Sequence, residues 1–153
     1  MTFEEVLKMH GVHNHVDAIF IADGSGTVVG KPCGYAVYTH LKSGEALWLE
    51  GGSTTGTNNL AELSPFLLAL WHYQKLLGKE LRRIAMVTDS ELTVKCGNRE
   101  NGRAANLGLW ASIDYYADQV TELYWHWRPR RSTDILAECD DRAGKYRLSC
   151  QTE

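Results

Sequence analysis

The spacing of hydrophobic residues changes along the chain, and each spacing predicts one kind of element. Near the N-terminus, residues 16–22 are rich in valine, isoleucine and phenylalanine and predict a strand that delivers Asp23 at its end. Glycine-containing turns separate this strand from two further extended segments, residues 34–40 and 43–52. Three consecutive strands with short connections predict an antiparallel meander.

An amphipathic helix is predicted over residues 59–77, where apolar residues recur at steps of three and four. Thr57 or Asn58 is suited to cap this helix. Glu62 is then expected in the first turn, where the positive end of the helix dipole favours a carboxylate. Pro65 would cost about 3 kcal/mol in a helix interior, so we expect a later helix start or a kink.

Strands and helices alternate in the second half of the chain. The apolar run IAMV predicts a central strand, covered on both faces, that ends at Asp89. After it we expect a short helix over residues 90–96, a loop, a helix from Arg103 or Ala104 to about Ala117, a strand over residues 122–128, and a terminal helix from Thr133 or Asp134 that carries Asp140. With the first, fourth and fifth strands parallel, this order predicts an α/β fold. Its mixed five-stranded sheet is flanked by helices, and its site lies at the carboxyl ends of strands.

Composition and length indicate one soluble domain. Of the 153 residues, 44% are hydrophobic and 23% are charged. We expect one domain over residues 16–148, with an N-terminal arm or short helix at residues 1–15 and a tail at residues 149–153. Apolar runs are far shorter than the roughly 18 residues that a membrane span requires. The acidic start lacks the apolar region of a secretory signal, so we expect a cytoplasmic monomer with no membrane contact.

Neither the cysteines nor the N-terminal histidines form a metal motif. The cysteines are Cys33, Cys96, Cys139 and Cys150. They occur singly, without a CxxC pair, which indicates reduced thiols. His10, His13 and His15 lie close together but have no nearby thiol or carboxylate in a metal-binding pattern, so an exposed arm is expected.

Four carboxylates in separate segments are the strongest functional signal: Asp23, Glu62, Asp89 and Asp140, with Asp141 as the alternative to Asp140. Each taken alone could be a surface or capping residue. Gathered by the fold, they would bind hard divalent ions such as Mg²⁺ or Mn²⁺. Two such ions clamp the attacking and leaving oxygens of a phosphodiester, which indicates a metal-dependent nuclease. The net charge of −3 includes this cluster, which bound metal would neutralise.

The segments around these acids resemble a known family. They are the DGS element at residues 23–25, TNNLAEL at 57–63, TDS at 88–90 and CDDRA at 139–143. In this order the chain resembles type 1 ribonuclease H from Ile19 to Lys145. The resemblance implies a ribonuclease H-like fold and an endonuclease that hydrolyses the RNA strand of RNA/DNA hybrids. It also implies two Mg²⁺ ions, with Mn²⁺ as a substitute, and products with 5′-phosphate and 3′-hydroxyl ends.

The resemblance also implies roles for individual residues. Asp23 and Asp89 would contact or bridge both ions, and Glu62 and Asp140 would complete the shells. The residues implied in substrate binding are Gly24, Ser25, Asn58, Asn59 and Ser90 at the minor groove of the hybrid, and Thr57 with Asn106 at a phosphate of the DNA strand. Arg130 and Arg131 lie in the loop where the family commonly carries a histidine. A guanidinium could replace that histidine electrostatically, but not as a base.

Two other functions are compatible with the sequence. One is another nuclease of the same superfamily, such as a junction resolvase or a structure-specific DNA nuclease. The other is a catalytically silent module that binds the hybrid, which would result if the altered terminal segment failed to supply a fourth carboxylate. The intact DGS and TNN elements favour ribonuclease H.

Overall fold

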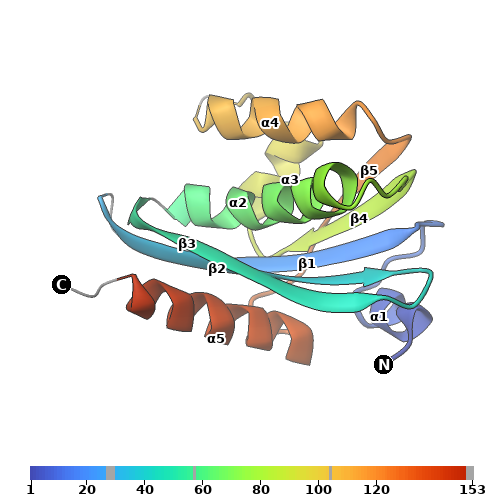
Figure 1. Ribbon diagram of the computed structural model, residues 1–153, viewed down its shortest axis with the longest axis horizontal. Coiled ribbons are helices and arrows are strands. Elements are labelled where there is room, and N and C mark those ends of the chain that lie inside the picture. Colours follow the sequence, from blue (N-terminus) through green and yellow to red (C-terminus); the bar gives the residue numbers. More distant parts are fainter. Residues whose placement is uncertain (27–29, 57, 104, 151–153) are drawn as a thin grey trace.

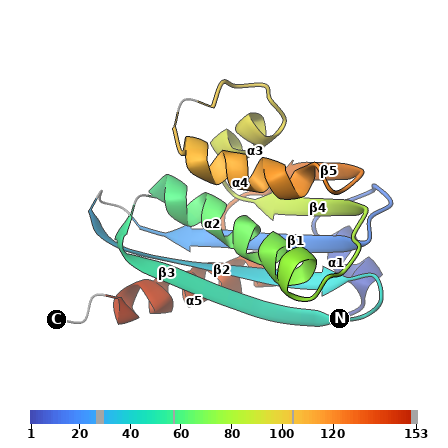
Figure 2. The same cartoon turned by 45° about the horizontal axis from the view of Figure 1, so that its top comes forward.

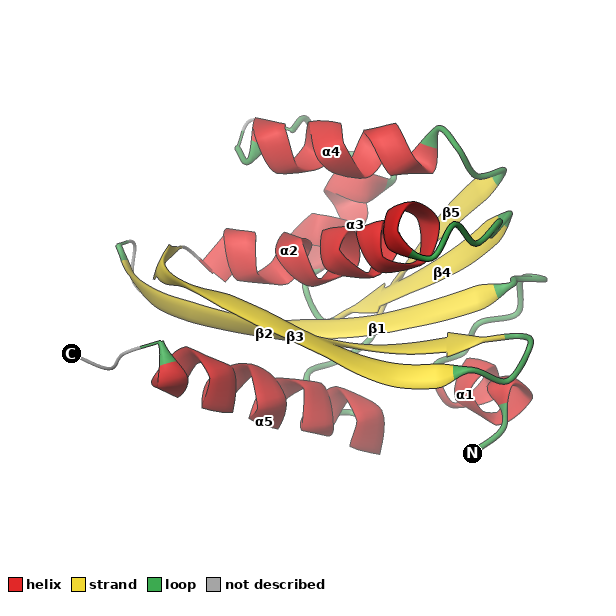
Figure 3. Ribbon diagram, in the orientation of Figure 1, coloured by secondary structure: helices red, strands yellow, loops and turns green. Residues whose placement is uncertain are grey.

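The computed structural model describes residues 1–26, 30–56, 58–103 and 105–150. A five-stranded sheet in the order β3-β2-β1-β4-β5 carries helices on both faces (Figure 1, Figure 3). The strands are β1 Ala18–Ser25, β2 Lys31–Leu41, β3 Ala46–Gly56, β4 Arg83–Thr88 and β5 Glu122–Trp127. The helices are α1 Phe3–Met9, α2 Asn58–Leu70, α3 Glu91–Gly97, α4 Leu107–Ala117 and α5 Asp134–Ser149, and the π-helix η1 Trp71–Leu76 continues α2.

The strand pairing confirms the predicted mixed sheet. β1, β2 and β3 pair antiparallel, whereas β1 with β4 and β4 with β5 pair parallel. Several strand boundaries differ from the prediction, and two of them have a clear local cause. β1 continues through Asp23 to Ser25, because Ser25 still pairs with Gly34 of β2. β3 begins only at Ala46, since the turn before it is closed by a hydrogen bond from the Gly44 N–H to the Leu41 carbonyl at 2.8 Å.

Alternation along β1 builds a core on each face of the sheet. Phe20 of β1 packs with Phe66 of α2 and Met86 of β4 on the face that α2 and α4 cover. Ile21 faces the other side, where it packs with Leu136 of α5. α2 and α4 run side by side above the sheet, and α5 lies below it (Figure 1, Figure 2). Burial on both faces explains the continuous apolar runs of the central strands.

The long helix differs from its predicted form at both ends. α2 begins at Asn58 and runs through Pro65, so the expected late start is wrong, and the chain changes to a π-helix only at Trp71. Pro65 is buried between core positions, and this packing offsets the backbone hydrogen bond that proline cannot donate. Glu62 therefore lies in the second turn, and the predicted help from the helix dipole does not apply. Thr57, one proposed cap, lies outside the described residues.

The N-terminal segment packs against the domain rather than forming an exposed arm. His10 is fully buried, which contradicts the prediction for it, whereas His13 and His15 are exposed as expected. The His10 ring makes hydrogen bonds with the Val6 carbonyl and the Thr133 hydroxyl, both at 2.9 Å. These partners satisfy both ring nitrogens, so the imidazole can be buried, and burial lowers its pKa.

Helix α4 starts later than predicted. It begins at Leu107 rather than at Arg103 or Ala104. Asn106 adopts φ 57°, in the left-handed region, which no residue of a right-handed helix can occupy. The helix therefore cannot extend backwards through it. Ala104 lies outside the described residues.

The cysteines agree with the sequence analysis. All four are free thiols, and Cys33, Cys96 and Cys139 are buried. Burial raises the pKa of the Cys33 and Cys139 thiols, so both are held in the neutral form. Among the helices that the structure describes, none has the length and apolar character needed to cross a bilayer.

Candidate active site

Neighbouring parallel strands deliver two carboxylates to one edge of the sheet. Asp23 lies near the end of β1, and Asp89 directly follows the last residue of β4. The two strands are paired in register, with Ile21 opposite Val87. Their carboxyl ends therefore lie side by side, at the edge where open α/β sheets place their sites.

Close approach of α2 to β1 adds the third carboxylate. A Cβ atom on Gly24 would lie 2.5 Å from the carbonyl carbon and oxygen of Ala61, so only glycine allows this contact. Glu62 follows Ala61 and is thereby held next to the end of β1. Carboxylate oxygens of Asp23, Glu62 and Asp89 all lie within 4.8 Å of one another. The structure thus brings together three of the four acids singled out in the sequence.

Replacing Gly24 by alanine is expected to separate these acids and to destabilise the fold. The added methyl group meets rigid backbone, and overpacking of this kind typically costs about 1 to 3 kcal/mol of unfolding free energy. Chemical denaturation measures the effect. Gly108→Ala is the matched control, because a Cβ there meets no atom within 4 Å and alanine favours a helix. Equal stability of Gly24→Ala and the wild type would show that the approach of α2 tolerates a side chain.

Asp140 of α5 lies in the wall of the same cleft. The cleft has a volume of about 570 Å³, and Gly24, Ser25, Gly26, Ser90 and Arg130 line it together with the four acids. The Asp140 side chain is 17% exposed, and that of Asp141 is 63% exposed. Of these two candidates, the structure places Asp140 beside the acidic cluster.

Burial and mutual repulsion raise the pKa values of the clustered acids. Burial is the largest cause and, together with the nearby charges of Asp23, Asp89 and Asp140, it raises the pKa of Glu62 to about 9. The pKa of Asp23 rises to about 7 through burial and the charge of Asp89, although the Gly24 N–H donates to its Oδ1 at 2.8 Å. Burial also raises the pKa of Asp89, against the effect of Arg130. The positive charge near the cluster, which includes Arg130, is therefore too small to balance its carboxylates.

The residues present fit a hard divalent cation. Glu62 Oε2 is buried and has no hydrogen-bond partner among the described residues. A buried polar atom in this state carries a desolvation cost that a ligand can remove. Carboxylate oxygens alone make up the cluster, and this donor set suits Mg²⁺ or Mn²⁺ rather than a softer metal.

The residues predicted to bind substrate fall into separate groups. Gly24, Ser25 and Ser90 line the cleft. Ser90 also caps α3, since its Oγ accepts hydrogen bonds from the Thr93 N–H at 3.2 Å and the Thr93 hydroxyl at 2.9 Å. Thr57 and the side chains of Asn58 and Asn59 lie outside the described part of the chain, so their predicted roles stay predictions.

Asn106 is not part of the acidic cleft. It precedes α4 and lines a smaller hollow of about 150 Å³ with Arg103 and Trp110. The Arg103 guanidinium lies 4.1 Å from the centre of the Trp110 ring and pairs with Asp114. Arg103 is therefore held in place as a positive charge beside Asn106.

Trp127 supports Asp89, a role that the sequence did not indicate. The Trp127 indole N–H donates to the Asp89 carbonyl at 3.0 Å and so fixes the backbone of this acid. This contact follows from the register of β4 and β5, which pairs Thr88 with Trp127. Hydrophobic periodicity contains no information on that register.

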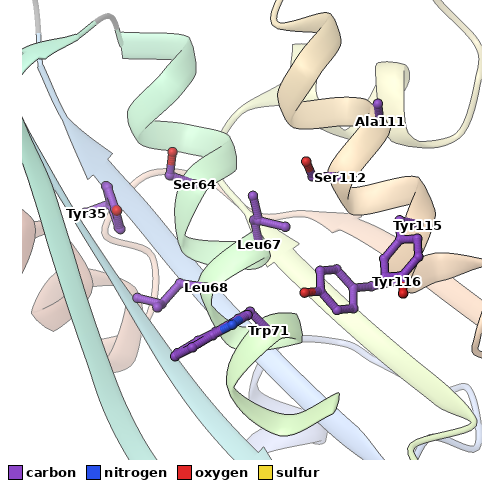
Figure 4. Close-up of a pocket in the computed structure, with 9 residues that line it drawn as sticks. All are labelled: Tyr35, Ser64, Leu67, Leu68, Trp71, Ala111, Ser112, Tyr115 and Tyr116. Atoms are coloured by element: carbon purple, nitrogen blue, oxygen red, sulfur yellow. The ribbon is translucent and has the colours of Figure 1, made fainter. Parts of the chain in front are cut away.

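A second large hollow, also about 570 Å³, lies between α2 and α4 and contains no metal ligands. Figure 4 shows Tyr35 on one side of it, Leu67 of α2 and Trp71 of η1 in the middle, and Tyr115 and Tyr116 on α4. Its lining is mainly apolar and aromatic and includes no carboxylate. It therefore cannot replace the acidic cleft as the candidate metal centre.

Comparisons with known proteins identify related structures. No family model matches the sequence, and no curated protein matches it. The N-terminal RNase H domain of Rv2228c from Mycobacterium tuberculosis is 21% identical, with a TM-score of 0.71 over 89% of this chain and 96% of that one. LC11-RNase H1, isolated from compost and solved with an RNA/DNA hybrid, is 21% identical, with a TM-score of 0.71 over 88% and 99%. RNase H1 from Halobacterium salinarum is 19% identical, with a TM-score of 0.67 over 84% and 96%. At these identities the likeness concerns the fold.

Proposed function

We propose that this chain, which has the fold of type 1 ribonucleases H, is a metal-dependent endonuclease that hydrolyses the RNA strand of RNA/DNA hybrids. The solved structures confirm the fold predicted from the sequence motifs. The proposed products have 5′-phosphate and 3′-hydroxyl ends. The observation that supports the chemistry best is the cluster of Asp23, Glu62 and Asp89 oxygens within 4.8 Å at the ends of two parallel strands.

In the proposed mechanism, the carboxylates hold two Mg²⁺ ions, which Mn²⁺ can replace. Such ions activate water and stabilise the leaving 3′-oxygen when they are bound. Asp23, Glu62 and Asp89 form the common donor set, and Asp140, which lines the same cleft, would add a further carboxylate. Arg130, next to Asp140, contributes positive charge toward a phosphate group of the substrate.

Recognition of the hybrid is proposed to use the backbone of Gly24 and Ser25, with Asn58, Asn59 and Ser90. The minor groove of a hybrid displays 2′-hydroxyl groups, and these distinguish RNA from DNA. Thr57 and Asn106 are proposed to bind a phosphate of the DNA strand. Three of these residues, Gly24, Ser25 and Ser90, line the acidic cleft directly, which supports their assignment to the scissile region.

A cleavage assay with labelled hybrid, duplex, single-stranded and junction substrates tests the proposal. We expect the chain to cut the RNA strand of an RNA/DNA hybrid in Mg²⁺ or Mn²⁺, and to leave duplex RNA, duplex DNA and single strands intact. Chelation with EDTA should abolish cleavage, since the buried carboxylates then lack a countercharge. Cleavage of a DNA junction but not of the hybrid would favour a junction resolvase, and hybrid binding without turnover in Mn²⁺ would favour a silent binding module.

A further inference from the structure

Two arginines hold the carboxylate that lies outside the metal-ligand cluster. Asp140 Oδ2 accepts a hydrogen bond from Arg131 Nη1 at 2.7 Å and from Arg130 Nη2 at 3.4 Å. Among the described residues, the group of mutually close ligand oxygens contains Asp23, Glu62 and Asp89, and Asp140 is not a member. One oxygen of Asp140 is therefore engaged by two guanidinium groups rather than shared with the other acids.

The loop before α5 fixes the position of Arg131. The Ser132 N–H donates to the Pro129 carbonyl at 3.1 Å and closes a tight turn, within which Arg131 adopts φ 54°. Arg131 also pairs with Asp141 at 3.0 Å, so its guanidinium bridges two adjacent residues of α5. Thr133 caps α5 immediately after the turn, accepting from the Leu136 N–H at 3.1 Å. These contacts hold the arginine pair, Arg130 and Arg131, next to Asp140.

Both arginines remain accessible to a ligand. The Arg130 and Arg131 side chains are 72% and 44% exposed, whereas the Asp140 side chain is mostly buried. Exposed ion pairs contribute little to stability, and solvent competes with them. A phosphate offers a guanidinium two parallel, charge-assisted hydrogen bonds. A nucleic-acid phosphate that enters the cleft can therefore compete for the arginine pair.

We propose that the arginine pair withholds Asp140 from divalent metal in the free protein, and that a phosphate of the bound substrate releases it. This inference rests on the proposed function, because it assumes that the acidic cluster binds metal. In the free protein, Arg130 and Arg131 neutralise the charge of Asp140 in place of a metal ion. When the substrate engages the arginines, Asp140 becomes a metal ligand. Substrate and metal therefore bind cooperatively, and linkage requires each to strengthen the other by the same factor.

The first test asks whether the arginine pair withholds Asp140 in the free protein. Electron paramagnetic resonance measures Mn²⁺ binding to the full chain without substrate. Arg131→Asn removes the guanidinium and keeps a residue that tolerates the left-handed region. Arg130→Gln leaves the turn at Arg131 unchanged and serves if the first variant is unstable. Each is expected to raise the affinity for Mn²⁺ by about tenfold, within the usual range of coupling between sites. Arg142→Gln is the matched control. It removes the same charge from α5, but from an arginine that pairs with Glu50 and Glu138.

An uncleavable hybrid with a 2′-O-methyl RNA strand tests whether bound substrate releases Asp140. It should raise the Mn²⁺ affinity of the wild type by about tenfold, and of the Arg130→Gln variant by much less. Equal affinities in the wild type and both arginine variants would overturn the inference, and so would an equal gain in Arg142→Gln, which would assign the effect to net charge. Failure of the wild type to bind Mn²⁺ at all would instead overturn the proposed function.

Discussion

Asp23→Asn is expected to reduce the rate of hybrid cleavage by at least about 10³-fold, because a lost metal ligand removes several kcal/mol of transition-state stabilisation. Asp23 contributes an oxygen to the three-oxygen cluster, and the charges of Asp89 and Asp140 act on it. Asparagine has nearly the same shape and can still accept the hydrogen bond from the Gly24 N–H. The substitution therefore removes a charge without removing the contact that orients the side chain.

Binding separates this effect from unfolding. Removing a negative charge from the cleft reduces repulsion of the nucleic-acid backbone, so Asp23→Asn should bind the hybrid as well as the wild type or better. Single-turnover cleavage and a filter-binding assay measure the two quantities. Asp118→Asn, at an exposed position near the end of α4, provides the control and should cleave at the wild-type rate. A variant at position 23 that cuts within about tenfold of the wild-type rate would remove Asp23 from the mechanism.

Local pattern was sufficient to predict the positions of Asp23 and Asp89. Each follows an apolar run of residues that predicts a strand, and carboxyl ends of parallel strands meet at one edge of a sheet. The pairing of β1 with β4 needed the family motifs or the structure, because hydrophobic periodicity does not say which strands are neighbours. Glu62 reaches the same point only because Gly24 admits the backbone of Ala61, a contact between residues far apart in the sequence.

Several features of the structure could not be predicted from the sequence. The burial of His10 is one of them, because its partner, the Thr133 hydroxyl, lies 123 positions further along the chain. The helix start at Asn58 and the passage through Pro65 reflect core packing that overrides local propensity. The ion pair between Arg131 and Asp140 depends on the left-handed backbone of Arg131 in a tight turn. Arginine rarely adopts this conformation, so the sequence does not predict it. Tertiary contacts decided the first two features, and a local turn decided the third.

Glu62→Gln is expected to stabilise the metal-free protein at pH 8 while it removes the response to metal. Folding raises the pKa of Glu62 from its ordinary value of 4.5 to about 9. A carboxyl shifted in this direction is stabilised in its neutral form by folding. The contribution of Glu62 to the unfolding free energy is therefore fully present below its pKa in the unfolded chain. It is lost as pH rises through its pKa in the folded protein. In EDTA, the unfolding free energy of the wild type should fall between about pH 4.5 and 9, and Asp23 adds to this fall as pH approaches 7.

Glutamine at position 62 keeps the shape of the side chain and does not ionise. At pH 8 the wild type must take up a proton at Glu62 on folding, and the variant avoids this cost. We expect a gain of about 2 to 4 kcal/mol at pH 8 in EDTA, the order of the cost of holding a carboxyl neutral a few pH units above its ordinary pKa. Glu100→Gln, at an exposed position, should leave both the stability and its pH dependence unchanged. Addition of Mg²⁺ should stabilise the wild type, because the ion binds only the folded cluster, and should have little effect on Glu62→Gln. Chemical denaturation at pH 5 and pH 8, with and without metal, measures the unfolding free energy of each protein under the four conditions.

A Glu62→Gln protein no more stable than the wild type at pH 8 in EDTA would show that some other group neutralises the cluster. Arg130, whose charge lowers the pKa of Glu62, would be the first group to examine.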